Sequence, residues 1–215
     1  MLPDTFIVLF LATYEKLLAL GQRVQGRSYS ASDFTRLIRR QFPATDFVFK
    51  TYRDYAVDPD CVIVAGLYDV WDDKQYLPCI TVTLCYHPDQ EKYFVDLLNW
   101  RQLSFDLAEC IGHELVHRDQ HRNGRKPSLK SYVSKSTNPS IKSEQQYLGS
   151  EDEIEAYGFS IAAECAVFGK PKDQCVMYQA YVETFDTDTA IVLKLEQQVE
   201  RYLKRMEHIN EQINN

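Results

Sequence analysis

The chain is 215 residues long, with 45% hydrophobic and 26% charged residues. This composition is typical of a soluble globular protein, and it excludes a disordered chain, a fibrous repeat and a disulfide-dominated miniprotein. The formal net charge of −7 and a pI near 5.3 argue against a general nucleic-acid binder, because such proteins need a basic surface.

The N-terminal sequence and the cysteines bear on the cellular compartment. The first uninterrupted apolar run, Phe6 to Ala12, is much shorter than the about 20 residues of a membrane-spanning helix. Asp4 stands where a secretory signal needs basic residues, so we expect a buried N-terminal helix and no membrane span. None of the six cysteines forms a C-x-x-C pair, and the sequence therefore predicts free thiols in a reducing cytoplasm.

The first half of the chain combines helical and strand-like segments. Ser32 provides a cap for a short second helix, and Pro43 provides its stop. Runs rich in β-branched residues predict strands, and the turn 71–75 should join two of them in a hairpin. The predicted elements are helices over 3–21, 33–41 and 101–122 and strands over 47–52, 61–70 and 77–86.

The stretch from 123 to 149 has a different character. It is polar, rich in serine and without clear periodicity, so we expect a loop. The segment from Arg118 to Gln146 contains seven basic residues and only two acidic ones, Asp119 and Glu144, although the chain is acidic overall. This basic loop, 118–146, is either a solvated flexible segment or a contact for substrate or a partner, and it is the region in which we would look for nucleic-acid binding.

Three helices complete the predicted chain. Ser150 caps a helix over 151–168, a second covers 173–185, and the last begins near Asp188. Apolar residues on the last helix alternate at spacings of three and four, which is a heptad stripe. The stripe consists of Val192, Leu195, Val199, Tyr202, Met206, Ile209 and Ile213. It packs either on its own domain or against a second copy of the chain, as a homo-oligomer.

An H-E-x-x-H motif occupies residues 113–117, inside the predicted helix 101–122. Side chains four residues apart lie one above the other on a helix, so the imidazoles of His113 and His117 can bind one zinc ion. Zinc lowers the pKa of its bound water to about 7, and Glu114 can act on that water as a general base. We expect one Zn²⁺ per chain, with both histidines as ligands.

A catalytic zinc needs a third protein ligand, and the helix 151–168 offers two carboxylates. We favour Glu153 over Glu155, and both share a helix face with small residues that allow the two helices to approach. Ser150 and Glu153 also fit a capping box, which would use the same carboxylate for the backbone. His121 continues the spacing of the motif, but a third imidazole one further turn along the helix rarely binds the same ion.

These segments resemble the zincin metallopeptidases of the gluzincin type, in which two histidines come from one helix and a glutamate from the next. Glu153-x-x-Ala156 resembles the Glu-x-x-Ala-Asp segment of several small gluzincins, in which the first glutamate binds zinc. The same string is similar to short uncharacterised H-E-x-x-H proteins of bacteriophages. Where the family has an aspartate that orients a ligand histidine, this chain has Tyr157. The resemblance covers about residues 78–168, and the metzincins fit poorly, because their third histidine would fall at Asn123.

The resemblance implies an α+β, zincin-like fold, dominated by helices, with a small twisted β-sheet packed beside the metal-binding helices. We expect a single domain over 1–215, with a core at about 45–186, N-terminal helices over 1–44 and the heptad helix over 187–215. In zincin-like folds the strand before the active helix forms the sheet edge beside the cleft. Residues 81–86 would then line the substrate, although an interior strand fits the sequence equally well.

The implied function is that of a zinc-dependent metallohydrolase, most simply a metallopeptidase acting on a protein or peptide in the host cytoplasm, or in a virion if the chain is virus-encoded. A peptidase also needs a donor for the developing oxyanion, and Tyr132, Tyr147 and Tyr157 are candidates. The alternative is a catalytically weak or inactive zincin-like scaffold, used as a viral accessory, structural or protein-interaction module.

Overall fold

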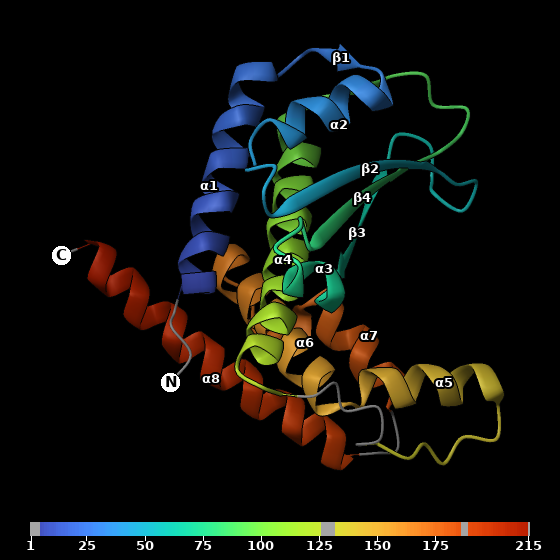
Figure 1. The fold of residues 1–215 in the computed structure, drawn as a ribbon, viewed down its shortest axis with the longest axis vertical. Helices are drawn as coiled ribbons and strands as arrows, with labels where there is room; N and C mark the ends of the chain where they lie inside the picture. Colours follow the sequence, from blue (N-terminus) through green and yellow to red (C-terminus); the bar gives the residue numbers. More distant parts are fainter. Residues whose placement is uncertain (1–4, 126–131, 186–188, 215) are drawn as a thin grey trace. The chain divides into compact units, whose positions relative to one another are not determined.

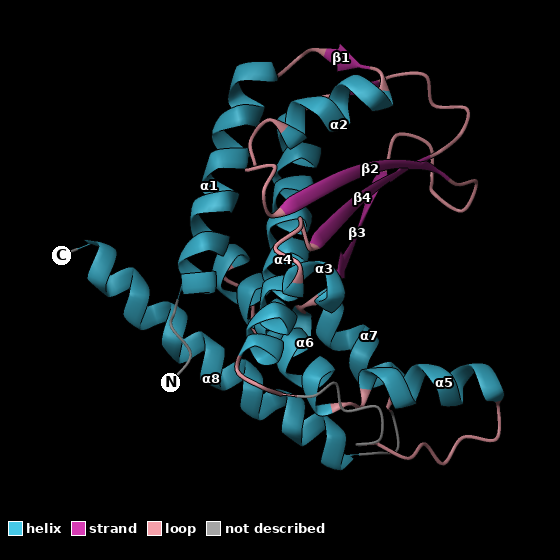
Figure 2. Cartoon of the chain, viewed as in Figure 1, coloured by secondary structure: helices cyan, strands magenta, loops and turns pink. Residues whose placement is uncertain are grey.

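The computed structural model describes residues 5–125, 132–185 and 189–214, and in these ranges helices dominate beside a small sheet (Figures 1 and 2). The predicted α+β class is confirmed. The chain folds into two compact units, Ile7–Leu115 and Val116–Asn215, and the second unit also takes in the N-terminal residues up to Phe6. The boundary falls inside one continuous helix, α4 (Leu97–Arg122).

The first unit contains helices, a two-stranded ladder and a three-stranded sheet. Ser30, rather than the predicted Ser32, caps the second helix, because its Oγ accepts a hydrogen bond from the Asp33 amide at 3.2 Å. The elements before α4 are α1 (Thr5–Val24), β1 (Ser28–Tyr29), α2 (Ala31–Arg39), β2 (Phe47–Arg53), β3 (Val62–Tyr68), α3 (Val70–Lys74), β4 (Ile80–Tyr86) and β5 (Tyr93–Phe94).

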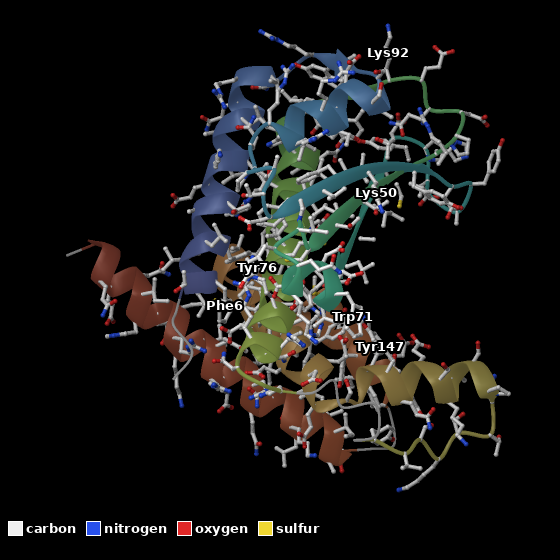
Figure 3. The ribbon with its side chains drawn as sticks, in the orientation of Figure 1. Phe6, Lys50, Trp71, Tyr76, Lys92 and Tyr147 are labelled. Atoms are coloured by element: carbon white, nitrogen blue, oxygen red, sulfur yellow. The ribbon has the colours of Figure 1, made fainter. Side chains whose placement is uncertain are left out.

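The three-stranded sheet has the order β2-β4-β3, with β2 parallel and β3 antiparallel to β4. Alternate side chains of β4 are buried from Ile80 to Tyr86, as a central strand requires. Of the two predicted places for 81–86, the interior strand is therefore confirmed and the edge is not, and β2 and β3 are the outer strands of this sheet. The predicted pairing of the two strands is confirmed, but short helix α3 forms their connection. Trp71 on α3 and Tyr76 after it are both exposed (Figure 3).

Helix α1 is long and apolar enough to cross a membrane by length and composition alone, with a mean hydropathy of 1.3 over its candidate span. The core helices of soluble proteins pass the same test. One face of α1, which includes Phe10 and Leu17, is buried. The indole Nε1 of buried Trp100 donates a hydrogen bond to the Leu17 carbonyl at 2.7 Å. These contacts identify α1 as a packed helix of the first unit.

The second unit is helical in its described part, and α6 is its most buried element. Helix α6 packs against α8, and Gly158 permits the close approach, since a Cβ there would lie 2.4 Å from the Gln198 Cβ. The elements are the end of α4, α5 (Pro139–Leu148), α6 (Glu151–Phe168), the short 3₁₀ helix η1 (Lys172–Gln174), α7 (Val176–Thr184) and α8 (Thr189–Asn214).

The heptad stripe of α8 is used within this unit. Five of its seven residues, Leu195, Val199, Tyr202, Met206 and Ile209, are at most 4% exposed. The Tyr202 ring packs edge-to-face on Phe159 of α6, with ring centroids 5.7 Å apart. The stripe therefore packs on its own unit, the first of the two predicted arrangements. An oligomer through the same stripe would have to displace α6.

The polar stretch predicted as a loop contains a helix, α5. Asn138 caps it by accepting a hydrogen bond from the Ser140 amide at 3.0 Å, and Pro139 occupies its first turn. None of its residues is buried, so the sequence carries no apolar periodicity from which a helix could be predicted. Lys126 and Lys130 of the predicted basic loop lie outside the described residues.

Candidate metal centre

The H-E-x-x-H motif lies in the last third of α4, where the helix is continuous. His113 and His117 are separated by four residues and project from one face of this helix. Both are half-buried, which leaves each ring partly accessible. The predicted helix carries the motif as expected, and α4 begins four residues earlier than predicted.

Helix α6 supplies the carboxylate. Its first turn is fixed by Ser150, whose Oγ accepts a hydrogen bond from the Glu153 amide at 3.3 Å. The Ser150 amide donates to the Tyr147 carbonyl at 3.1 Å. The Glu153 carboxylate is directed to His117, with Oε1 at 3.4 Å from Nε2. The cap bond engages the backbone amide of Glu153, and the Glu153 carboxylate lies beside His117.

His113, His117 and Glu153 each offer one ligand atom, and these three atoms all lie within 4.8 Å of one another. Two imidazole nitrogens and one carboxylate oxygen are a typical donor set for zinc. Two atoms that each lie about 2.1 Å from one tetrahedral ion are separated by about 3.4 Å, and the His117–Glu153 pair has this separation. The residues present therefore fit a zinc ion. His121, one turn further along α4, is not in this group.

Gln120 orients His117. Its Oε1 lies 3.0 Å from His117 Nδ1, so Nδ1 carries the proton and donates, and Nε2 is the nitrogen left for a metal. The Gln120 amide donates in turn to the Asp152 carbonyl at 3.0 Å and to the Glu155 carboxylate at 3.2 Å. Gln120 is thus placed to orient His117, a role that the gluzincin resemblance would give to an aspartate at position 157. It was not among the predicted site residues, although its place three residues after His117, on the same helix, was visible in the sequence.

We expect Gln120→Ala to weaken zinc binding about 10–100-fold, the usual cost of removing a residue that orients a metal ligand. Without Gln120, the His117 ring could rotate, or it could carry its proton on Nε2 instead of Nδ1. Competition with a chromophoric chelator measures the affinity. Gln197→Ala, on the exposed face of α8, is the matched control. An unchanged affinity in Gln120→Ala would refute the orienting role.

Glu155, the alternative third ligand, is occupied by other contacts. It is 3% exposed, and its carboxylate forms an ion pair with Arg125 and a second with Arg201 at 3.4 Å. The Tyr202 hydroxyl donates to the same carboxylate at 3.3 Å. These partners turn Glu155 towards α8 and the end of α4, and of the two glutamates only Glu153 belongs to the ligand group.

Glu114 is buried in the first unit beside the edge strand β3. A Cβ built on Gly66 of β3 would lie 2.7 Å from Glu114 Oε1 and 2.7 Å from the Cys110 sulfur. A larger residue at position 66 would therefore have to displace the side chains of Glu114 and Cys110. The carboxylate of the predicted general base lies against the backbone of the sheet edge as a result.

Gly66→Ala should displace the Glu114 side chain and cost about 1–3 kcal/mol of stability, because the added methyl overpacks the contact. We expect lower hydrolytic activity with the zinc content unchanged. Metal analysis, thermal unfolding and an activity assay test this together. Ala65→Gly, at an exposed neighbouring position of β3, controls for changes in strand flexibility. Wild-type activity in Gly66→Ala would show that the position of Glu114 does not matter.

The three candidate oxyanion donors differ in their surroundings. Tyr147 is 59% exposed, the Tyr132 ring packs against Phe185 at 5.5 Å, and the Tyr157 ring packs against Tyr181 at 5.7 Å. Burial, with a smaller contribution from the Glu153 carboxylate, raises the pKa of Tyr181 above its ordinary value. Tyr181 therefore stays neutral near Glu153, and its hydroxyl donates to the Leu148 carbonyl at 2.8 Å.

Comparisons with known proteins add no family to this description. No family model matches the chain, and neither a curated protein nor a solved structure matches it significantly.

Proposed function

We propose that this chain is a zinc-dependent metallohydrolase, and specifically a metallopeptidase of the zincin type. The observation that carries the proposal is the convergence of His113, His117 and Glu153 to within 4.8 Å. In hydrolytic zinc sites, two histidines and one glutamate bind the ion and leave a fourth position for water or substrate. The six free thiols of the chain agree with the proposed cytoplasmic location.

Each residue of the site has a defined role in this reaction. A bound zinc ion would lower the pKa of a water molecule and polarise the substrate carbonyl. Glu114, which follows the first ligand histidine, takes the proton of the attacking water and passes it to the leaving amine. Gln120 holds His117 in the tautomer that presents Nε2. Ser150 fixes the first turn of α6, from which Glu153 projects.

The edge strand β3 suits a peptide substrate. Its outer edge pairs with no other strand in the described part of the chain, and extended peptides bind such edges through backbone hydrogen bonds. Gly66 places this strand next to Glu114, within the same unit. A peptide added to β3 would therefore run past the proposed general base.

The test is cleavage of a peptide library by the untagged, zinc-loaded chain, with products identified by mass spectrometry. We expect new termini that disappear when a zinc chelator is added and return when zinc is restored. A chain that holds zinc fully but cleaves no peptide, protein or simple amide would contradict the proposal. The scaffold alternative, a zincin-like module without catalysis, would then be favoured.

A further inference from the structure

A second feature of the first unit is a basic surface on α2, independent of the proposed metal site. Two cavities lie along this helix, one of about 490 Å³ and one of about 320 Å³. Arg36 and Arg40 line both of them, so the cavities are neighbours that share a wall. Both volumes fall in the range of about 300–1,000 Å³ that is usual for ligand sites.

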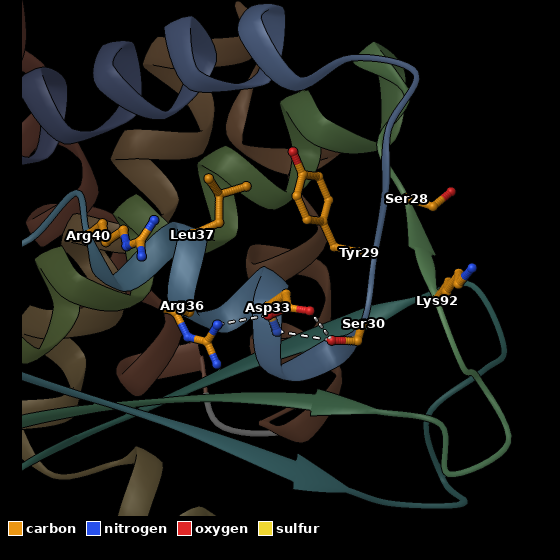
Figure 4. A pocket seen from close by; sticks show the side chains of 8 residues that line it. All are labelled: Ser28, Tyr29, Ser30, Asp33, Arg36, Leu37, Arg40 and Lys92. Atoms are coloured by element: carbon orange, nitrogen blue, oxygen red, sulfur yellow. Dashed lines mark hydrogen bonds and ion pairs between the residues drawn. The ribbon is translucent and has the colours of Figure 1, made fainter.

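The lining of the two cavities is strongly cationic. Arg36, Arg39, Arg40 and Lys92 contribute positive charges, and Asp33 is the one carboxylate among the lining residues. Asp33 forms an ion pair with Arg36 at 2.9 Å and accepts a hydrogen bond from Ser30 at 2.8 Å (Figure 4). The arginines are exposed. A concentration of positive charge in a chain of net charge −7 indicates an anionic ligand.

The amphipathic character of α2 explains the placement of these charges. Ala31, Phe34, Thr35 and Ile38 are buried, and Phe34 packs edge-to-face on Trp100 with ring centroids 5.6 Å apart. This packing fixes the opposite face of α2 towards solvent. Any polar residue on the exposed face would keep this amphipathic helix soluble. The packing of α2 therefore does not explain why three of the exposed residues are arginines.

Aromatic rings lie next to the cations. Phe42 and Phe49 line the smaller cavity, with ring centroids 5.1 Å apart, and both are half-buried. Tyr29 lines the larger cavity beside Leu37 (Figure 4). Positive charge beside partly exposed aromatic side chains is typical of proteins that bind single-stranded nucleic acid, where bases stack on the rings and cations contact the phosphates.

We propose that the α2 groove, defined by Tyr29, Arg36, Arg39, Arg40, Phe42 and Lys92, binds single-stranded nucleic acid. Two adjacent cavities with a shared cationic wall suit a polymer with repeating phosphates better than one small anion. A duplex fits less well, because its bases are stacked on each other and cannot stack on protein rings. This surface is distinct from the predicted basic loop 118–146, because none of its lining residues belongs to that segment.

The test is fluorescence anisotropy of the full chain with a fluorescein-labelled oligothymidylate of about 15 nucleotides, a length suited to a single groove. With three to four phosphate contacts, log K should fall with log salt concentration with a slope of about −2 to −3. Arg36→Ala/Arg40→Ala should weaken binding about tenfold or more in about 50 mM salt and make the slope less steep by about 1.4. Lys194→Ala/Lys204→Ala, exposed on α8, is the charge-matched control.

A third variant separates nucleic acid from other polyanions. Phe42→Leu keeps the charge of the groove, so it should weaken oligothymidylate binding several-fold and leave heparin binding unchanged. Circular dichroism checks that the variant is folded. Absence of wild-type binding at low salt, equal losses in the two double variants, or oligothymidylate binding that is unaffected by Phe42→Leu would each overturn the proposal.

Discussion

Glu114→Gln should lower the rate of peptide hydrolysis by about 10²–10⁴-fold, the usual contribution of a general base. Glutamine has nearly the shape of glutamate but cannot take a proton from water. The substitution also keeps the side chain against β3, where Gly66 leaves room for it. We therefore expect the zinc content and the thermal stability of the variant to stay close to those of the wild-type chain.

The matched control is Glu109→Gln, a substitution of a second buried glutamate on α4. It should leave the activity within a few-fold of wild type, since Glu109 is not part of the ligand group or of the motif. Equal activity in wild type and Glu114→Gln would show that Glu114 is not the base. If the biological function of the chain also survived this substitution, the scaffold alternative would replace the enzyme.

Glu153→Gln and Glu155→Gln should separate metal binding from stability. Glu153→Gln removes a charged ligand atom, so we expect zinc affinity to fall by more than the about 10–100-fold seen for residues that only orient a ligand. Glu155→Gln should retain zinc. It should instead lose about 1–3 kcal/mol of stability, because Gln120 and Tyr202 lose charge-assisted hydrogen bonds. The partner arginines are about half exposed, which limits the cost.

Chelator competition and thermal unfolding on both variants provide the two measurements. The pair forms its own control, since both positions lie in the first turns of α6 and carry the same change of charge. Loss of zinc in Glu155→Gln with retention in Glu153→Gln would reverse the assignment of the third ligand.

The helices that carry the site could be predicted from the sequence because their determinants are local. α6 begins after Ser150 and ends at Gly169, whose φ of 64° is the left-handed conformation that favours glycine. The motif on α4 fixes its own geometry by helical spacing. The local sequence could not decide between Glu153 and Glu155 as the third ligand. That choice depends on which of the two carboxylates pairs with Arg125 and Arg201, and these residues come from other parts of the chain.

Other features could not be predicted because they depend on packing. The order of strands in the sheet depends on long-range pairing. An alternating segment such as Ile80–Tyr86 is therefore compatible with either an edge strand or a central strand. The spacing of Gln120 from His117 is visible in the sequence, but its contacts with the Asp152 carbonyl and Glu155 depend on how α6 packs beside α4. The division of the chain into two units falls inside α4, where no linker composition marks it.

Metal analysis of the untagged protein tests most directly whether the three converging side chains bind zinc. The wild-type chain and His113→Ala would be dialysed against zinc, freed of excess metal and measured by elemental mass spectrometry, with His208→Ala, exposed on α8, as the matched control. We expect about one zinc per chain in wild type and His208→Ala, and little in His113→Ala. No zinc in the wild type, or equal zinc in all three proteins, would contradict the account.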